Sequence, residues 1–187
     1  MRDVHPGAVL WFTGLSGAGK STIAAAVHHV LLAADVPSEL LDGDAVRAIS
    51  PAGFSREDRD AHVRRVGFLA SRLEHHGVTV SCALISPYAA ARQWVRDRCE
   101  RFIEIHIATP LAECERRDVK GLYRRARAGE IAHFTGIDDP YEAPTRPDLL
   151  VDTSTMPLER TVAEVIAVWS RRTGRPIAGS PAALTGR

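Results

Sequence analysis

The sequence lacks a strong net charge, a long apolar run and a cysteine framework. Its 24 basic and 23 acidic side chains leave a formal net charge of +1, which provides no overall field for nucleic acid or an acidic membrane surface. No apolar run approaches membrane-spanning length, and no secretory signal is visible at the amino terminus. Cys82, Cys99 and Cys114 lie far apart without metal-ligand spacing, which is typical of a reducing cytosol. We therefore expect a cytoplasmic protein that binds neither nucleic acid nor membranes.

The residues that are present indicate one folded domain. The 187 residues are 45% hydrophobic and 25% charged, as in globular proteins whose core needs no disulfide or metal. Glycine, proline, serine and other small residues dominate the carboxyl end. The composition predicts a domain over residues 1–172 and a flexible tail over residues 173–187.

The most specific motif is a glycine-rich loop between an apolar run and a helix-like run. Strand, glycine loop and helix in this order are typical of a P-loop, in which inward-turned N–H groups and the positive helix end hold phosphate. Lys20 adds a charge for the terminal phosphates, and Ser21 offers a hydroxyl to Mg²⁺. A glycine-rich turn that binds nothing is the alternative, but both flanking elements favour a nucleoside triphosphate. The predicted nucleotide-binding residues are Gly14, Leu15, Ser16, Gly17, Ala18, Gly19, Lys20, Ser21 and Thr22.

Apolar runs alternate with helical patterns along most of the chain. This alternation predicts an α/β protein of the P-loop NTPase fold, with a five-stranded parallel sheet and helices on both faces. Ligands of such sheets bind beyond the carboxyl ends of the strands, so the P-loop, Asp42–Asp44, Ser86–Pro87 and Thr109 should share one rim. The expected strands are Val9–Thr13, Glu39–Asp42, Val78–Ile85, Phe102–Ala108 and Leu149–Asp152.

Helices are expected after four start signals and at one further segment. Lys20–Ala34 follows the P-loop, and Pro157–Arg171 is the last helix. A capping box, Ser55 with Asp58, precedes a long helix that ends at Gly77. Ser86-Pro87 and Thr109-Pro110 each place a proline at the first position of a helix. The long helix should bury Val63, Val66, Leu69, Ala70 and Leu73.

Residues 118–147 do not fit the alternation. The segment is polar, rich in glycine and proline, and contains Lys120, Arg124, Arg125 and Arg127. Connections of this length in compact domains are usually functional. We predict a lid that folds over substrate.

Asp42 and Asp44 follow the strand that should lie beside the P-loop. A carboxylate there can hold Mg²⁺ through water or accept the proton of an attacking hydroxyl, although Asp-Gly-Asp is also a favourable turn. The acid that motor ATPases and GTPases carry at the end of a buried strand is missing. Val78–Ile85 is followed by Ser86, and Glu104 lies within its strand. This pattern favours a small-molecule kinase.

Arginines cluster where phosphate or sulfate groups would need them. Arg47 and Arg59 neighbour rim motifs, and we expect their guanidinium groups to bind an oxyanion; Arg92, after Ser86, belongs to the same cluster. Arg64 and Arg72 fit a solvated helix face better.

Three other features leave alternatives open. Phe54 and Phe134 lie in polar loops, where either a small apolar cluster or a stacking pair for a planar base explains them. The eight histidines have no metal-ligand spacing, which favours surface positions. Ser86 fits the cap of a helix that begins at Pro87, and the sequence shows no base that would activate it as a nucleophile.

Together these residues resemble the adenylylsulfate kinase (APS kinase) family. The resemblance rests on the P-loop, on Asp42-Gly43-Asp44 with Arg47, on Phe54–Arg59 and on Ile85–Tyr88. It is most specific in the lid, where residues 120–123, 126–131 and 134–142 are similar to the family nearly letter for letter. The similarity runs in order from about Pro6 to Arg171.

The resemblance implies an ATP- and Mg²⁺-dependent kinase of sulfate activation. Such an enzyme phosphorylates the ribose 3′-hydroxyl of adenosine 5′-phosphosulfate (APS), which gives 3′-phosphoadenosine-5′-phosphosulfate (PAPS) and ADP. It implies that Asp42 faces this hydroxyl and, through water, Mg²⁺, and that Lys20 and lid cations stabilise the moving phosphoryl group. It also implies a homodimer and permits association with an ATP sulfurylase. The implied APS-binding residues are Asp42, Asp44, Arg47, Phe54, Arg59, His62, Ile85, Ser86, Pro87, Lys120, Leu122 and Phe134.

The resemblance favours one role for Phe54 and Phe134, but the roles of Ser86 and His62 stay open. It implies that Phe54 and Phe134 sandwich the adenine of APS. Family descriptions name the serine at position 86 a phosphoserine intermediate, whereas direct in-line transfer needs no covalent step. His62 stands where the family usually has asparagine, and it could donate a hydrogen bond that makes acceptor binding pH-dependent.

Two rival functions remain. A related P-loop small-molecule kinase with another acceptor would be supported by His62. A non-catalytic nucleotide-binding subunit of a sulfate-activating complex is opposed by the presence of Lys20, Ser21, Asp42 and the lid.

Overall fold

The computed structural model describes residues 7–50 and 53–177. The amino-terminal segment 1–6 and residues 178–187 of the predicted tail lie outside the described residues. Thr173 is the last residue of the last helix, and Ile177 packs into the core with 8% of its surface exposed. The strands are β1 (Ala8–Thr13), β2 (Ser38–Asp42), β3 (Thr79–Ala83), β4 (Phe102–Ile107) and β5 (Leu149–Val151). The helices are α1 (Lys20–Ala33), α2 (Gly43–Ile49), α3 (Arg56–His75), α4 (Ala89–Arg96), α5 (Leu111–Arg117), α6 (Leu122–Arg127) and α7 (Leu158–Thr173).

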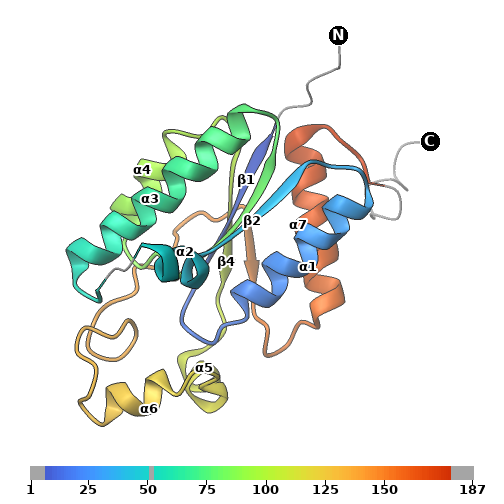
Figure 1. Ribbon diagram of the computed structural model, residues 1–187. Helices are drawn as coiled ribbons and strands as arrows, with labels where there is room; N and C mark the ends of the chain where they lie inside the picture. Colours follow the sequence, from blue (N-terminus) through green and yellow to red (C-terminus); the bar gives the residue numbers. More distant parts are fainter. Residues whose placement is uncertain (1–6, 51–52, 178–187) are drawn as a thin grey trace.

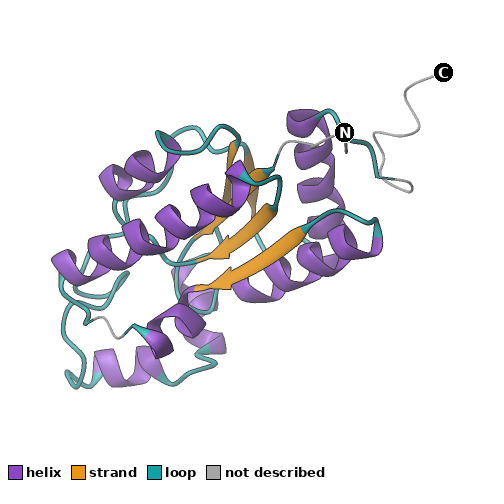
Figure 2. Ribbon diagram, turned by 45° about the horizontal axis from the view of Figure 1, so that its top comes forward, coloured by secondary structure: helices purple, strands orange, loops and turns teal. Residues whose placement is uncertain are grey.

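The five strands form one parallel sheet in the order β2-β3-β1-β4-β5, which confirms the predicted fold class. Figure 2 shows this sheet between two layers of helices. Helices α1 and α7 cover one face, and α3 and α4 cover the other (Figure 1). Helices α5 and α6 and the segment 118–147 lie at the carboxyl ends of the strands, as predicted for the lid.

Strand β1 is the centre of the core. All six of its residues are fully buried, because the strand is apolar and paired on both sides, with β3 and β4. Its side chains alternate between two apolar clusters. Leu10 and Phe12 pack beneath α1 and α7, whereas Val9 and Trp11 pack beneath α3 and α4. The same alternation in β4 turns Glu104 towards the α4 face.

The amino terminus of α3 confirms the predicted capping box. The hydroxyl of Ser55 accepts a hydrogen bond from the N–H of Asp58 at 3.1 Å. Val63, Val66 and Ala70 are buried as expected. The prediction for Leu69 is wrong, since 43% of its surface is exposed: it lies beside the packed face of α3 rather than on it.

Two helix starts differ from the sequence prediction. Helix α4 begins at Ala89, with Tyr88 as its N-cap, so Pro87 is not the first helical residue and Ser86 caps nothing. Helix α5 begins at Leu111, and Pro110 rather than Thr109 is the N-cap. In both places the hydroxyl before the proline makes a tertiary hydrogen bond instead of capping a helix: Ser86 donates to Thr13, and Thr109 donates to the carbonyl of Ala18.

Helix α2 was not predicted. Its N-cap is Asp42, whose Oδ1 accepts the N–H of Asp44 at 2.9 Å and of Ala45 at 3.4 Å. The strand-end turn and the short helix are therefore one feature. It fixes the direction in which the second carboxylate oxygen of Asp42 points.

No helix among the described residues is long and apolar enough to span a membrane.

Gly67 tests the packing of α3 against α4. A Cβ built on Gly67 would lie 2.3 Å from Cγ2 and 2.8 Å from Cγ1 of Val95. Alanine improves helix propensity by about 1 kcal/mol, but overpacking costs about 1–3 kcal/mol, so Gly67→Ala should lower the free energy of unfolding. Urea unfolding of the variant measures this change.

The matched control isolates propensity, because Ala61→Gly alters an exposed position of the same helix and should cost about 1 kcal/mol. Adding Val95→Ala to Gly67→Ala should recover part of the lost stability. A Gly67→Ala protein more stable than the parent would contradict the proposed clash.

Candidate functional site

The P-loop residues take the conformation that an anion site requires. Gly14 has φ 150°, and a Cβ at this position would lie 2.4 Å from the carbonyl oxygen of Ile107. Gly19 has φ 103° and is the N-cap of α1, so the helix begins directly at Lys20. The loop therefore turns tightly at both ends, and the positive end of α1 faces the space above it.

Lys20 is buried and folds back onto its own loop. Only 8% of the surface of Lys20 is exposed, and its Nζ donates a hydrogen bond to the carbonyl oxygen of Leu15 at 2.7 Å. Burial lowers the pKa of Lys20 from 10.5 to about 8. An ammonium group held out of water in this way lies ready to pair with an incoming phosphate.

Ser21 and Asp42 meet at the edge of the P-loop. The hydroxyl of Ser21 donates to Oδ2 of Asp42 at 2.5 Å, while Oδ1 of the same carboxylate caps α2. The carboxylate that reaches the P-loop serine therefore comes from the end of β2. This geometry agrees with the missing acid at the ends of the buried strands.

Segment 118–147, the predicted lid, packs against the P-loop. Tyr123 of α6 donates its hydroxyl to the carbonyl oxygen of Ser16 at 2.9 Å, and Gly136 lies against the Leu15 side chain. Lys120 forms an ion pair with Asp44, which joins the lid to α2.

The predicted aromatic and basic residues of the acceptor line the same cavity as the P-loop. Phe54 is 40% exposed, and the guanidinium groups of Arg47 and Arg59 lie 5.6 and 5.4 Å from its ring centre. Phe134 is 1% exposed and packs edge-to-face on Tyr123, with ring centres 5.1 Å apart. Phe134 therefore satisfies the expectation of an apolar cluster, while a stacking role for both rings stays a prediction.

Arg59 lies beside the Phe54 ring and is almost fully buried, with 4% exposure. It donates to the carbonyl oxygens of Phe54 and, across to the lid, His133, at 3.0 and 2.9 Å. The expected oxyanion contact of Arg59 stays a prediction.

His62 lines the same cavity and is 4% exposed, so a surface position is wrong for it, as it is for His106 at 8%. Burial, and then the charges of Arg47 and Arg65, lower the pKa of His62 to about 4. The ring is therefore neutral near pH 7 in the ligand-free protein. A pH-dependent acceptor affinity through His62 stays a prediction. Its Nδ1 has no hydrogen-bond partner within the part of the chain that the structure describes.

Ser86 has a structural role other than the predicted helix cap. Its backbone is left-handed, with φ 42°, and the residue is 2% exposed. Its hydroxyl donates to Oγ1 of Thr13 at 2.9 Å and accepts from Nε1 of Trp11 at 3.1 Å. Both neighbours are neutral, and neither is a base that could activate a nucleophile.

Arg92 is not placed to bind an anion. It is 4% exposed, and its guanidinium group donates to Glu104, to the carbonyl of Ser86 and to the carbonyl of Glu142. The exposed positions expected for Arg64 and Arg72 are confirmed.

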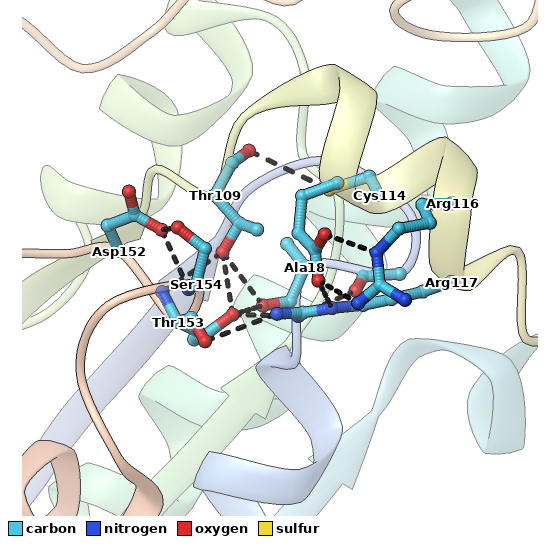
Figure 3. Close-up of polar contacts among 10 residues, drawn as sticks. Ala18, Thr109, Cys114, Arg116, Arg117, Asp152, Thr153 and Ser154 are labelled. Atoms are coloured by element: carbon cyan, nitrogen blue, oxygen red, sulfur yellow. Dashed lines mark hydrogen bonds and ion pairs between the residues drawn. The ribbon is translucent and has the colours of Figure 1, made fainter.

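The sequence prediction missed Thr153, which belongs to a polar cluster behind the P-loop. Figure 3 shows the hydroxyls of Thr109 and Thr153 converging on the carbonyl of Ala18, at 3.2 and 3.0 Å. Arg117 of α5 donates to Thr153 Oγ1 at 2.8 Å. Thr153 follows β5, so the rule that ligand-binding residues gather at carboxyl ends of strands would have found it had it been applied there.

One cavity of about 280 Å³ joins these groups. Four predicted site residues do not line it: Gly14, Leu15, Ala18 and Asp42. Seven lining residues were not predicted as site residues: Gly43, Val63, Ala83, Leu84, Asp118, Val119 and Tyr123. The predicted residues that line it are Ser16, Gly17, Gly19, Lys20, Ser21, Thr22, Asp44, Arg47, Phe54, Arg59, His62, Ile85, Ser86, Pro87, Lys120, Leu122 and Phe134.

The donor set at the P-loop edge suits a hard cation. Ser21 Oγ and Asp42 Oδ2 are oxygen donors at the mouth of the phosphate loop, as Mg²⁺ with a nucleotide requires. Among the described residues there is no cluster of three or more His, Cys, Asp or Glu side chains that could hold a metal by itself. All three cysteines are free thiols.

Known proteins of one family match most of this chain. The sequence profile described as adenylylsulphate kinase matches residues 6–152. The chain is similar to the adenylyl-sulfate kinase of Picosynechococcus sp., with 54% identity over 87% of this chain and 93% of that protein.

Two solved structures are also similar. The APS kinase CysC of Mycobacterium tuberculosis, in complex with AMPPNP and APS, matches with 43% identity and a TM-score of 0.84, over 88% of this chain and 98% of that one. A hexameric APS kinase from Thiobacillus denitrificans matches with 33% identity and a TM-score of 0.67, over 90% of this chain and 30% of that one.

Replacing Lys20 by methionine should stabilise the ligand-free protein at pH 7 by about 1–2 kcal/mol. A folded pKa of about 8 against 10.5 unfolded means that charged Lys20 opposes folding, at about 1.4 kcal/mol per pKa unit, and the lost bond to Leu15 offsets part of the gain. Between pH 8 and 10.5 the unfolded parent binds more protons than the folded one, so its stability rises with pH. The advantage of Lys20→Met, measured by urea unfolding, should therefore shrink over that window.

Lys120→Met is the matched control, since the Lys120 side chain is 53% exposed and its removal should give no such gain. A Lys20→Met protein less stable than the parent at pH 7 would contradict the cost assigned to burial of the charge.

His62→Asn should make the protein less sensitive to acid. The folded pKa of about 4 lies below the unfolded value of 6.5, so stability of the parent falls as pH drops from 6.5 to 4, by up to about 3 kcal/mol from this group. The variant should lose this slope in urea unfolding at pH 7, 5.5 and 4.5. His75→Asn, on the exposed end of the same helix, should keep it; identical slopes for all three proteins would refute the assignment.

Proposed function

The chain belongs to the adenylylsulphate kinase family, and on that premise we propose that it transfers the γ-phosphoryl group of ATP to the 3′-hydroxyl of APS. The products are PAPS and ADP, so the enzyme activates sulfate. The observation that carries the proposal is the shared cavity, which is lined by P-loop residues together with the expected acceptor residues. Asp42 is bonded to Ser21, one of the lining residues of the P-loop.

ATP occupies the P-loop side. Backbone N–H groups and the start of α1 hold its phosphates, and Lys20 exchanges the Leu15 carbonyl for the γ-phosphoryl group as negative charge develops there. Burial strengthens this interaction, because few water molecules screen the ammonium group. Arg117 and the hydroxyl cluster behind the loop keep the carbonyl of Ala18 turned away from the phosphates.

Mg²⁺ is the proposed cofactor, and Ser21 together with water carried by Asp42 would hold it. When bound with ATP, the ion neutralises charge on the β- and γ-phosphates. Asp42 has a further role, since its carboxylate orients the acceptor hydroxyl and takes its proton.

APS occupies the other side. Phe54 and Phe134 line it with aromatic surface for the adenine, and Arg47 and Arg59 supply positive charge for the phosphosulfate. His62 offers a neutral ring whose Nδ1 is unsatisfied among the described residues, which suits a hydrogen bond from the nucleotide. Asp44 and Lys120 pair at the mouth, and Leu122 with the Ile85–Pro87 backbone completes the wall.

Ser86 need not form a phosphoserine in this scheme. Direct in-line transfer requires no covalent intermediate, and the buried serine hydroxyl is already engaged twice. The family designation of Ser86 stays a prediction.

We further expect a homodimer in the cytoplasm. Support for assembly comes from the hexameric relative and from α3, where Phe68 and Leu69 are 55% and 43% exposed. Free thiols suit a reducing compartment. Association with an ATP sulfurylase rests on family resemblance alone.

A coupled assay of ADP release separates the rival functions. APS should support turnover with formation of PAPS, whereas other nucleotides and sugars should not. No turnover with APS and turnover with another acceptor would favour a related kinase. Binding of both ATP and APS without PAPS formation would favour a non-catalytic subunit.

Asp42→Asn should reduce kcat by about 10²–10⁴-fold while the fold and ATP affinity persist. Asparagine caps a helix as well as aspartate does, so α2 is retained, but the amide can neither take the proton nor carry charge. The measurements are kcat, calorimetric ATP binding and thermal unfolding. Asp97→Asn, at an exposed position after α4, is the control; near-normal kcat in Asp42→Asn would remove the assigned role.

A further inference from the structure

Three hydrogen bonds join the end of the lid to residues Ile85–Ala89, which we call the acceptor loop. Tyr88 donates its hydroxyl to Oδ2 of Asp139 at 2.6 Å. The N–H of Glu142 donates to the carbonyl of Pro87 at 2.8 Å, and the N–H of Ala89 donates to Oε2 of Glu142 at 2.7 Å. Two segments more than fifty positions apart in sequence are thus fixed to each other.

Arg92 contacts both of these segments. Its guanidinium group donates to the carbonyl of Ser86 at 2.7 Å and to the carbonyl of Glu142 at 2.6 Å, and its Nε donates to Glu104 at 2.9 Å. One rigid, planar group therefore sets the distance between the acceptor loop and the lid end. Resting on the proposed function, we infer that Arg92 is a positioning residue for APS, although it does not line the cavity.

The loop needs such support because its backbone is strained. Ser86 has φ 42°, a left-handed conformation that costs a non-glycine residue about 1–2 kcal/mol. Its carbonyl is held by Arg92, and its hydroxyl is held by Trp11 and Thr13. Since Ile85, Ser86 and Pro87 form one wall of the cavity, relaxation of this strain would change the shape of the acceptor side.

The lid side of the junction leads to Phe134. The carboxylate of Asp138, next to Asp139, accepts the N–H groups of His133 and Phe134 at 2.7 and 2.6 Å. Phe134 is therefore carried on a short, internally bonded turn that Arg92 and Tyr88 anchor. Loss of the anchor should disturb both walls of the acceptor side and leave the P-loop contacts intact.

Glu104 supplies the negative charge that balances the buried guanidinium group of Arg92. It is 7% exposed and neutralises both Arg92 and Arg96, whose guanidinium group lies 2.9 Å from its Oε2. Arg96 shares the carboxylate and the helix with Arg92, but it has no hydrogen bond to the acceptor loop or the lid among the described residues. The two arginines therefore form a matched pair that separates charge balance from positioning.

The test compares Arg92→Met/Glu104→Gln, Arg92→Lys and Arg96→Met with the parent enzyme. In the double variant Arg92 and Glu104 lose their charges together, and Arg96, which loses its carboxylate partner, has a side chain that is 32% exposed to solvent, so the fold should survive. The KM for APS should rise about tenfold or more for the loss of two strong hydrogen bonds, and the KM for ATP should change less than about twofold. Arg92→Lys keeps the charge but cannot reach both carbonyls, so it should give a smaller rise of the same kind. Arg96→Met should leave both KM values unchanged.

Calorimetric titration with APS and thermal unfolding accompany the kinetics. A purely structural Arg92 would lower the unfolding temperature and the active fraction without separating the two KM values, and that outcome overturns the inference. Parent-like APS affinity in the double variant, or an equal loss in Arg96→Met, overturns it as well. If the parent binds APS but forms no PAPS, the proposed function fails, and the titration alone still decides whether Arg92 positions APS.

Discussion

The hydroxyl of Thr13 is the point on which the two halves of the site depend. Thr13 ends the fully buried strand β1, and the P-loop begins at the next residue. Its single proton goes to the carbonyl of Ile85 at 2.8 Å, so its oxygen is left to accept from Ser86 and from Tyr141, each at 2.9 Å. Because buried hydroxyls must find partners, this direction of donation is the one that satisfies all three groups. The donor loop, acceptor loop and lid end are therefore tied to one strand terminus.

Charge placement on the α4 side follows from the same strand geometry. Alternation in β4 sends Ile103 and Ile105 beneath α1 and α7 and sends Glu104 to the opposite face. A buried carboxylate there is costly unless it is paired, and Arg92 and Arg96 pair with both of its oxygens. An apolar substitute of similar volume could stabilise the core equally well, but it would not present guanidinium N–H groups to the carbonyls of Ser86 and Glu142.

The sequence was sufficient for features whose signal is local. The P-loop, the parallel sheet and the cap at Ser55 depend on short spacings that leave few alternatives, and all three agree with the structure. Prediction was wrong where a local signal competed with a tertiary contact. Ser86 before proline has the chemistry of a cap, but its hydroxyl bonds to residues more than seventy positions away. Likewise, the guanidinium group of Arg92 suits an anion ligand, but it is taken up by two carbonyls and one carboxylate that only the fold brings together.

The buried groups around the cavity share a physical character that bears on function. Lys20 is an ammonium group with a lowered pKa, His62 is a neutral ring with an unsatisfied nitrogen among the described residues, and Ser86 is a strained residue. Each opposes folding of the ligand-free chain, and each would gain from a bound nucleotide or from a wall kept in shape for one. Costs of this kind persist where the surrounding structure over-determines them, as the doubly paired β1 and the lid contacts do here. The groups that oppose folding thus lie around the cavity in which phosphate, adenine and the acceptor hydroxyl would meet.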